Sequence, residues 1–145
     1  MKYIQHSVFD QSVARVWLTF ALLTAVCGCS SKDFAAASGT VRFSDGSPIA
    51  GGVKVVRFEP LKTSENDVRR PAFSHIGEDG SFTMMTRQSG DGVEAGQYAV
   101  TFTVLNNQQT AKSLIPSKYN VPRTTPFQVA VDIDKSDWLF ELEKQ

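Results

Sequence analysis

The most reactive side chains of this chain are two cysteines, Cys27 and Cys29, the only thiols among its 145 residues. A Cys-x-Cys pair holds a metal ion only when further cysteine or histidine ligands complete the site, and none lies nearby in the sequence. A thiol can also form a disulfide or carry a covalent lipid. The residues in front of the pair favour the lipid.

An apolar run of residues 16–26 precedes the cysteines, with Arg15 at its start. The run holds 11 residues, whereas a helix that spans a bilayer needs about 20. A basic start followed by a short apolar stretch is typical of a secretory signal peptide, here residues 1–28. An uncleaved anchor and a signal cut by ordinary signal peptidase stay open as alternatives.

The order Val26-Cys27-Gly28-Cys29 resembles the lipobox of bacterial lipoproteins. The resemblance implies cleavage before Cys29 and acylation of its thiol with chains such as palmitate, while Cys27 leaves with the signal peptide. The protein is then expected in the cell envelope, lipid-anchored on the periplasmic or outer face of a membrane. The sequence does not distinguish the inner from the outer membrane. Residues 29–37 are expected to form a short tether to the domain.

The remaining residues offer little catalytic chemistry. Once the signal peptide is removed, His75 is the only histidine, and its place in a predicted strand indicates a solvated side chain. No serine lies in a nucleophile-elbow pattern, and no free thiol remains. We therefore expect no enzymatic activity and no cofactor. The 15 basic and 15 acidic residues balance, which argues against the basic surface that nucleic-acid binding requires.

The densest acidic cluster contains Asp132, Asp134 and Asp137. Calcium takes six to eight oxygen ligands, often from closely spaced aspartates. The stretch lacks the glycine and the distal glutamate of a helix-loop-helix calcium site. We interpret it as a solvated turn between strands, with no resident metal, and leave calcium as the alternative.

Residues 38–145 alternate between apolar and polar side chains, and turn residues interrupt them at short intervals. This pattern predicts short β-strands and no helix. Seven strands separated by Gly- and Pro-containing turns favour an all-β, antiparallel, seven-stranded β-sandwich. Its expected core includes Phe82, Tyr98, Phe102 and Trp138. The strands are predicted at residues 40–44, 53–59, 72–76, 81–86, 98–104, 127–133 and 138–142.

Several short motifs in these strands and turns resemble a carboxypeptidase regulatory-like domain, which has the transthyretin-like (prealbumin-like) sandwich fold. The resemblance covers residues 38–142, and it implies a short bacterial lipoprotein built on this fold. Because the motifs are mostly turn and core residues, they specify the fold far better than a function. They are Ser38-Gly39-Thr40-Val41, Asp45-Gly46-Ser47-Pro48-Ile49, Val56-Arg57-Phe58-Glu59-Pro60, Glu78-Asp79-Gly80-Ser81-Phe82, Gly96-Gln97-Tyr98-Ala99-Val100 and Ile115-Pro116-Ser117-Lys118-Tyr119.

The sequence thus predicts a non-catalytic, lipid-anchored envelope protein that is a structural or protein-interaction module. A carbohydrate-binding module is the alternative, since Phe73 is predicted to face outward and Tyr119 lies in a loop. Alternating strand directions place the long loop 106–126 away from the lipid, where loops on rigid scaffolds usually bind partners. Residues 69–70 would lie near the membrane. The candidate partner-binding residues are Gln108, Gln109, Lys118 and Tyr119, unless Tyr119 simply plugs the end of the sandwich.

Overall fold

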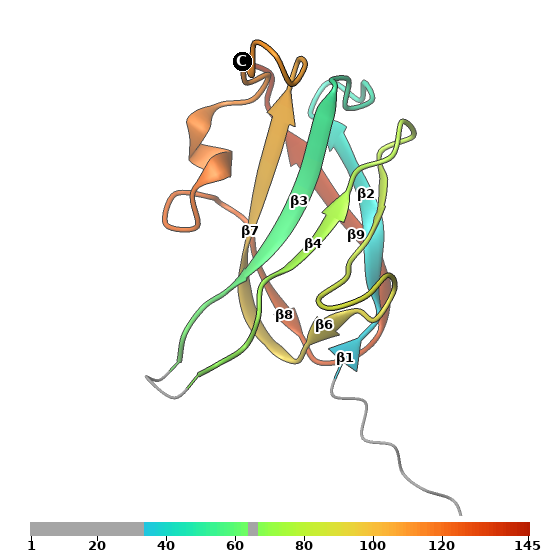
Figure 1. Cartoon of the computed structure of the whole chain (residues 1–145), viewed down its shortest axis with the longest axis vertical. Coiled ribbons are helices and arrows are strands. Elements are labelled where there is room, and N and C mark those ends of the chain that lie inside the picture. Colours follow the sequence, from blue (N-terminus) through green and yellow to red (C-terminus); the bar gives the residue numbers. More distant parts are fainter. Residues whose placement is uncertain (1–33, 64–66) are drawn as a thin grey trace, which may run out of the picture. The chain divides into compact units, whose positions relative to one another are not determined.

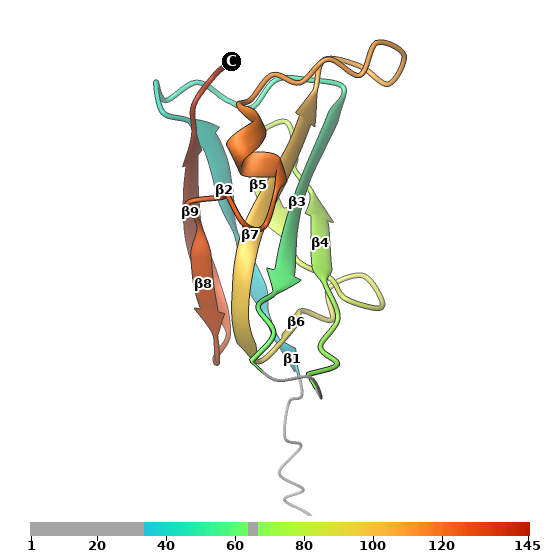
Figure 2. The same cartoon turned by 90° about the vertical axis from the view of Figure 1, so that its left-hand side faces the viewer.

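The computed structural model describes residues 34–63 and 67–145. The predicted signal peptide 1–28, Cys29 and residues 30–33 lie outside the described residues. The described chain forms nine β-strands and one short 3-10 helix (Figures 1 and 2). They are β1 (Phe34–Ala35), β2 (Ala37–Phe43), β3 (Val53–Pro60), β4 (Ala72–His75), β5 (Ser81–Thr83), β6 (Val93–Glu94), β7 (Gly96–Leu105), η1 (Ser117–Asn120), β8 (Gln128–Val131) and β9 (Lys135–Leu142).

The strands form two main sheets and a small third one. The larger sheet has the order β4-β3-β7-β8 and is antiparallel throughout. The smaller main sheet has the order β5-β2-β9, and the two-residue strands β1 and β6 pair with each other. Each of the seven predicted strands overlaps an observed strand, which confirms the all-β class, but the described chain has nine strands and not seven. Strands β1 and β6 were not predicted, because two residues show no alternation.

One pair of strands contradicts the antiparallel prediction. Strand β9 runs parallel to β2, with Val41 opposite Phe140. The direction follows from the strand before it, because β8 ends with Val131 opposite Gly96 at the start of β7. The turn at residues 132–134 therefore lies at the end of the sandwich where β2 begins, and the chain can only leave it in the direction of β2. The alternation of apolar and polar side chains along a strand does not indicate whether the neighbouring strand is parallel or antiparallel.

The two main sheets pack face to face through a cluster of aromatic rings. Phe140 of β9 lies 6.3 Å from Phe58 of β3 and 5.5 Å from Phe102 of β7, ring centre to ring centre, in edge-to-face contacts. The predicted core is confirmed for Tyr98, Phe102 and Phe82, which are at most 3% exposed. Trp138 is only partly buried and stacks on Phe140 at the rim of this cluster.

Residues 34–37 belong to the folded domain and not to the tether. Phe34 and Ala35 pair with Glu94 and Val93, and Ala37 begins β2. Ala35 and Ala37 are both buried in the core cluster. The stretch between Cys29 and the domain is therefore shorter than predicted, since Phe34 follows Cys29 by five positions.

Candidate functional site

The strand registers define two ends of the sandwich. At one end, which we call the tether end because Phe34 lies there, Pro60 pairs with Tyr98 and Gly96 with Val131. At the other, far end, Val53 pairs with Leu105. The connections 45–48, 76–80 and 106–112 lie at the far end, and the turn 132–134 lies at the tether end (Figures 1 and 2). Of the loop 106–126 that was predicted away from the start of the domain, only residues 106–112 lie at the far end, since Leu114 bonds to Val104 and Thr125 to Val100 along β7.

Gln108 and Gln109 project from a tightly hydrogen-bonded turn at the far end. Thr110 N–H donates to the Asn107 side chain at 2.8 Å, and Lys112 N–H donates to the Asn106 side chain at 3.1 Å. The turn also holds a non-glycine residue with positive φ, Ala111 at 49°. Both glutamines are exposed. A fixed backbone thus presents two neighbouring amide side chains to solvent, an arrangement that suits hydrogen bonding to a partner.

Tyr119 lies apart from these glutamines and is 3% exposed. Its ring stacks on Phe127 at 5.8 Å, and its hydroxyl accepts a hydrogen bond from Glu143 N–H at 3.3 Å. The Lys118 ammonium pairs with the Glu143 carboxylate at 2.8 Å, which raises the pKa of Lys118. Lys118 and Tyr119 therefore attach η1 to the end of β9, and the four predicted residues do not form one surface.

The segment that carries η1 closes one side of the sandwich. Leu114 N–H donates to the Val104 carbonyl at 2.9 Å, and the Thr125 hydroxyl donates to the Val100 carbonyl at 2.6 Å. Ile115 is fully buried in the core. The segment thus continues along β7 beyond the short strand β8, and it fills the space that a longer β8 would occupy. The packing of Tyr119 agrees with the plug that the sequence left as an alternative.

The outer face of the larger sheet carries the exposed aromatic side chain that the sequence predicted. Phe73 is 40% exposed and lies opposite Arg57 in the register, while His75 beside it is exposed and lies opposite Val55. The outward direction of Phe73 and His75 is therefore confirmed. A flat aromatic surface next to cationic and imidazole donors can stack on an apolar ligand face and donate hydrogen bonds around it.

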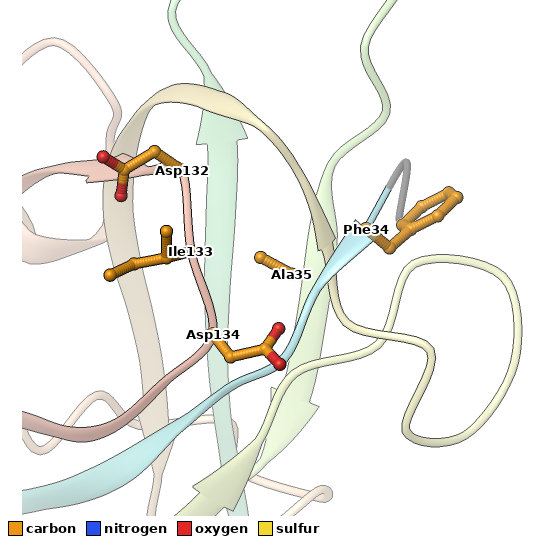
Figure 3. A pocket seen from close by; sticks show the side chains of 5 residues that line it. All are labelled: Phe34, Ala35, Asp132, Ile133 and Asp134. Carbon is orange, nitrogen blue, oxygen red and sulfur yellow. The ribbon is translucent and has the colours of Figure 1, made fainter. Parts of the chain in front are cut away.

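The three aspartates of the acidic cluster have separate roles. The Asp134 carboxylate accepts a hydrogen bond from Ala36 N–H at 2.8 Å, and Asp137 lies 3.8 Å from the Lys135 ammonium. Asp132 lines an open hollow of about 410 Å³ between the 132–134 turn and β1 (Figure 3). Within residues 34–63 and 67–145, no three acidic, histidine or cysteine side chains are grouped so that they could hold a metal ion. Asp134 thus serves to fix the turn to the start of β2.

Arg69 and Asp67 form a largely buried ion pair at the tether end. The Arg69 guanidinium donates hydrogen bonds to the Asp67 carboxylate and, at 2.8 Å, to the Leu61 carbonyl. It also lies 5.4 Å from the centre of the Tyr98 ring. Hydrogen bonds from Arg69 hold the pKa of Asp67 well below its usual range. A Cβ on Gly96 would lie 1.5 Å from the guanidinium. Glycine at this position therefore makes room for the arginine.

This pairing changes the interpretation of residues 69–70. The side chain of Arg69 is only 15% exposed and binds protein groups, so little of it is left to contact lipid headgroups. Arg70 is exposed, as is Lys62. The sequence signal that distinguishes the two arginines is the aspartate two positions before Arg69.

No protein-family model, curated protein or solved structure matches this chain. No helix in the described part of the chain is long and apolar enough to cross a bilayer.

Proposed function

We propose that this chain is a lipid-anchored protein of the bacterial cell envelope whose β-sandwich is a non-catalytic structural or protein-interaction module. The observation that carries the proposal is the order Val26-Cys27-Gly28-Cys29 after a short apolar run. The folded domain begins at Phe34, so a membrane anchor on Cys29 would sit a few residues in front of it. Each acyl methylene contributes roughly 0.8 kcal/mol to membrane binding, and two or three chains hold a protein firmly.

The module we propose is a carboxypeptidase regulatory-like, transthyretin-like sandwich. The turn motifs quoted above support it, and so do two facing sheets of three and four strands. In this proposal a protein partner meets the far end, where Gln108 and Gln109 are exposed on a rigid turn. A protein anchored at its N-terminus presents this end to the surrounding compartment.

The anchor is tested by the intact mass of the protein extracted from membranes. The mass should equal that of residues 29–145 plus the lipid, and Cys29→Ser should abolish the lipid and release the protein from membranes. Cys27→Ser is the matched control, because the first cysteine is expected to leave with the signal peptide. A Cys29→Ser protein that is still cut before residue 29 and remains equally membrane-bound contradicts the proposal.

A second function, carbohydrate binding, is favoured by one observation, the exposed ring of Phe73 beside Arg57 and His75. Sugar rings stack their apolar faces on such aromatic groups. On a glycan array, Phe73→Ala should abolish any binding that the unmodified protein shows. Leu139→Ala is the control, because it removes a side chain of similar exposure from the other sheet. Binding that survives Phe73→Ala places the glycan elsewhere and removes the support for this function.

A further inference from the structure

The two most exposed large apolar side chains among the described residues both lie at the tether end. Val68 is 87% exposed and Ile133 is 71% exposed, whereas Phe73, Val121 and Leu139 lie between 40% and 52%. Val68 lies between β3 and β4, and Ile133 lies in the turn between β8 and β9. Both connections are at the end of the domain where the described chain begins with Phe34 of β1 (Figures 1 and 2).

Val68 is exposed to solvent because its two neighbours in the chain, Asp67 and Arg69, pack on the domain. The side chain of Asp67 is 8% exposed and that of Arg69 is 15% exposed, because the two pair with each other against Tyr98. Arg69 is further bound to the Leu61 carbonyl. The backbone on both sides of Val68 is thereby fixed, and the valine points away from the domain instead of packing on it.

Ile133 is fixed in a comparable way. The Asp134 carboxylate accepts from Ala36 N–H, and Lys135 N–H donates to the Ala36 carbonyl at 2.8 Å. These two bonds attach the turn to the start of β2. The isoleucine lines the open hollow beside β1 while most of its surface faces solvent (Figure 3).

We infer that the tether end is a membrane-contacting face, and that Val68 and Ile133 insert into the headgroup region of the bilayer that holds the lipid anchor. This inference rests on the proposed acylation of Cys29. Five residue steps from Cys29 to Phe34 span at most about 18 Å when fully extended. The tether end therefore cannot move far from the lipid surface, and apolar side chains that point toward it lose their contact with water there.

The charges around Val68 and Ile133 predict which of the two side chains inserts more deeply into the bilayer. The exposed cations Arg70 and Lys62 lie near Val68 in the chain. Their positive charges are attracted to the phosphates of lipid headgroups. Ile133 lies between two aspartates, which are repelled by anionic lipid. Val68 should therefore insert more deeply than Ile133, and the difference should increase with the fraction of anionic lipid.

The inference is tested on the full chain by fluorescence. An acylated Cys29 leaves the mature chain without a free thiol, so Val68→Cys, Ile133→Cys and, as a far-end control, Gln108→Cys each allow labelling at one site with an environment-sensitive dye. The lipidated proteins are reconstituted into vesicles of phosphatidylcholine and phosphatidylglycerol that contain a nitroxide-labelled lipid as quencher. We expect quenching several-fold stronger at positions 68 and 133 than at position 108.

The outcomes separate this inference from the proposed function. Equal quenching at all three positions, whether weak or strong, overturns the membrane-contacting face. If intact mass shows acylated Cys29 at the same time, the anchor stands and only the face is wrong. An unmodified Cys29 in the membrane-extracted protein overturns the anchor and the face together.

Discussion

Removing the ring of Phe102 should destabilise the domain far more than removing the ring of Phe73, although both rings belong to the same sheet. Phe102 is 1% exposed and makes edge contacts with Phe127 at 5.7 Å and Phe140 at 5.5 Å. Truncation of such a buried ring to alanine costs about 3–5 kcal/mol through lost burial and the cavity that remains. Phe73 is 40% exposed on the outer face, so Phe73→Ala should cost less than about 1 kcal/mol.

The two variants can be compared by thermal unfolding of the whole protein. For a domain of this size, 1 kcal/mol corresponds to about 4 °C in Tm. Phe102→Ala should therefore lower Tm by about 12–20 °C and Phe73→Ala by about 4 °C or less. A double-mutant cycle of Phe102 with Phe140 should give about 0.5–1.5 kcal/mol of coupling beyond burial. Equal Tm values for the two single variants would refute the assignment of Phe102 to the interface between the sheets.

Three further outcomes are expected. Gly96→Ala should destabilise the domain clearly more than Gly46→Ala in chemical denaturation, since both glycines have positive φ but only the first would place a Cβ on the Arg69 guanidinium; equal losses would contradict this role of Gly96. Because the pKa of Asp67 is lower in the folded state than its usual value near 4, its contribution to stability is present above pH 4 and is lost as the pH falls below it. Denaturant titrations at pH 6 and pH 3 should show a smaller loss on acidification for Asp67→Asn than for the unmodified protein. Trp138→Phe should be close to neutral in Tm, because the indole N–H is buried without a hydrogen-bond partner among the described residues; a loss of 10 °C would contradict this expectation.

The alternation of side chains was sufficient to locate the seven longer strands and most of the core. Tyr98 and Phe102 lie at even positions of one strand, and period-two spacing places them on one face whatever the neighbouring strands do. The outward direction of Phe73 and His75 follows from the same rule. Pairing direction is a property of two strands, so the parallel contact of β9 with β2 required the position of the turn before β9.

The candidate site was less accessible to this reasoning, because it depends on contacts between distant segments. The sequence grouped Tyr119 with Gln108 as loop residues, yet Tyr119 packs on Phe127 and bonds to Glu143. It also treated residues 69–70 as equivalent cations. Arg69 can lie over the Tyr98 ring because Gly96 has no side chain in the same space. A local sequence pattern does not show which distant side chain approaches a glycine.

The parallel pairing of β9 with β2 has a consequence for the order in which this protein can fold. The side chains of Arg42 and Glu141 form a hydrogen bond between residues 99 positions apart in the chain. Because β2 comes near the start of the domain and β9 is its last strand, the smaller sheet cannot close before residues 135–142 have been synthesised. Such non-local pairing slows folding. Until β9 arrives, one edge of β2 is unpaired, and a chain that stops before Lys135 never acquires the strand that covers this edge.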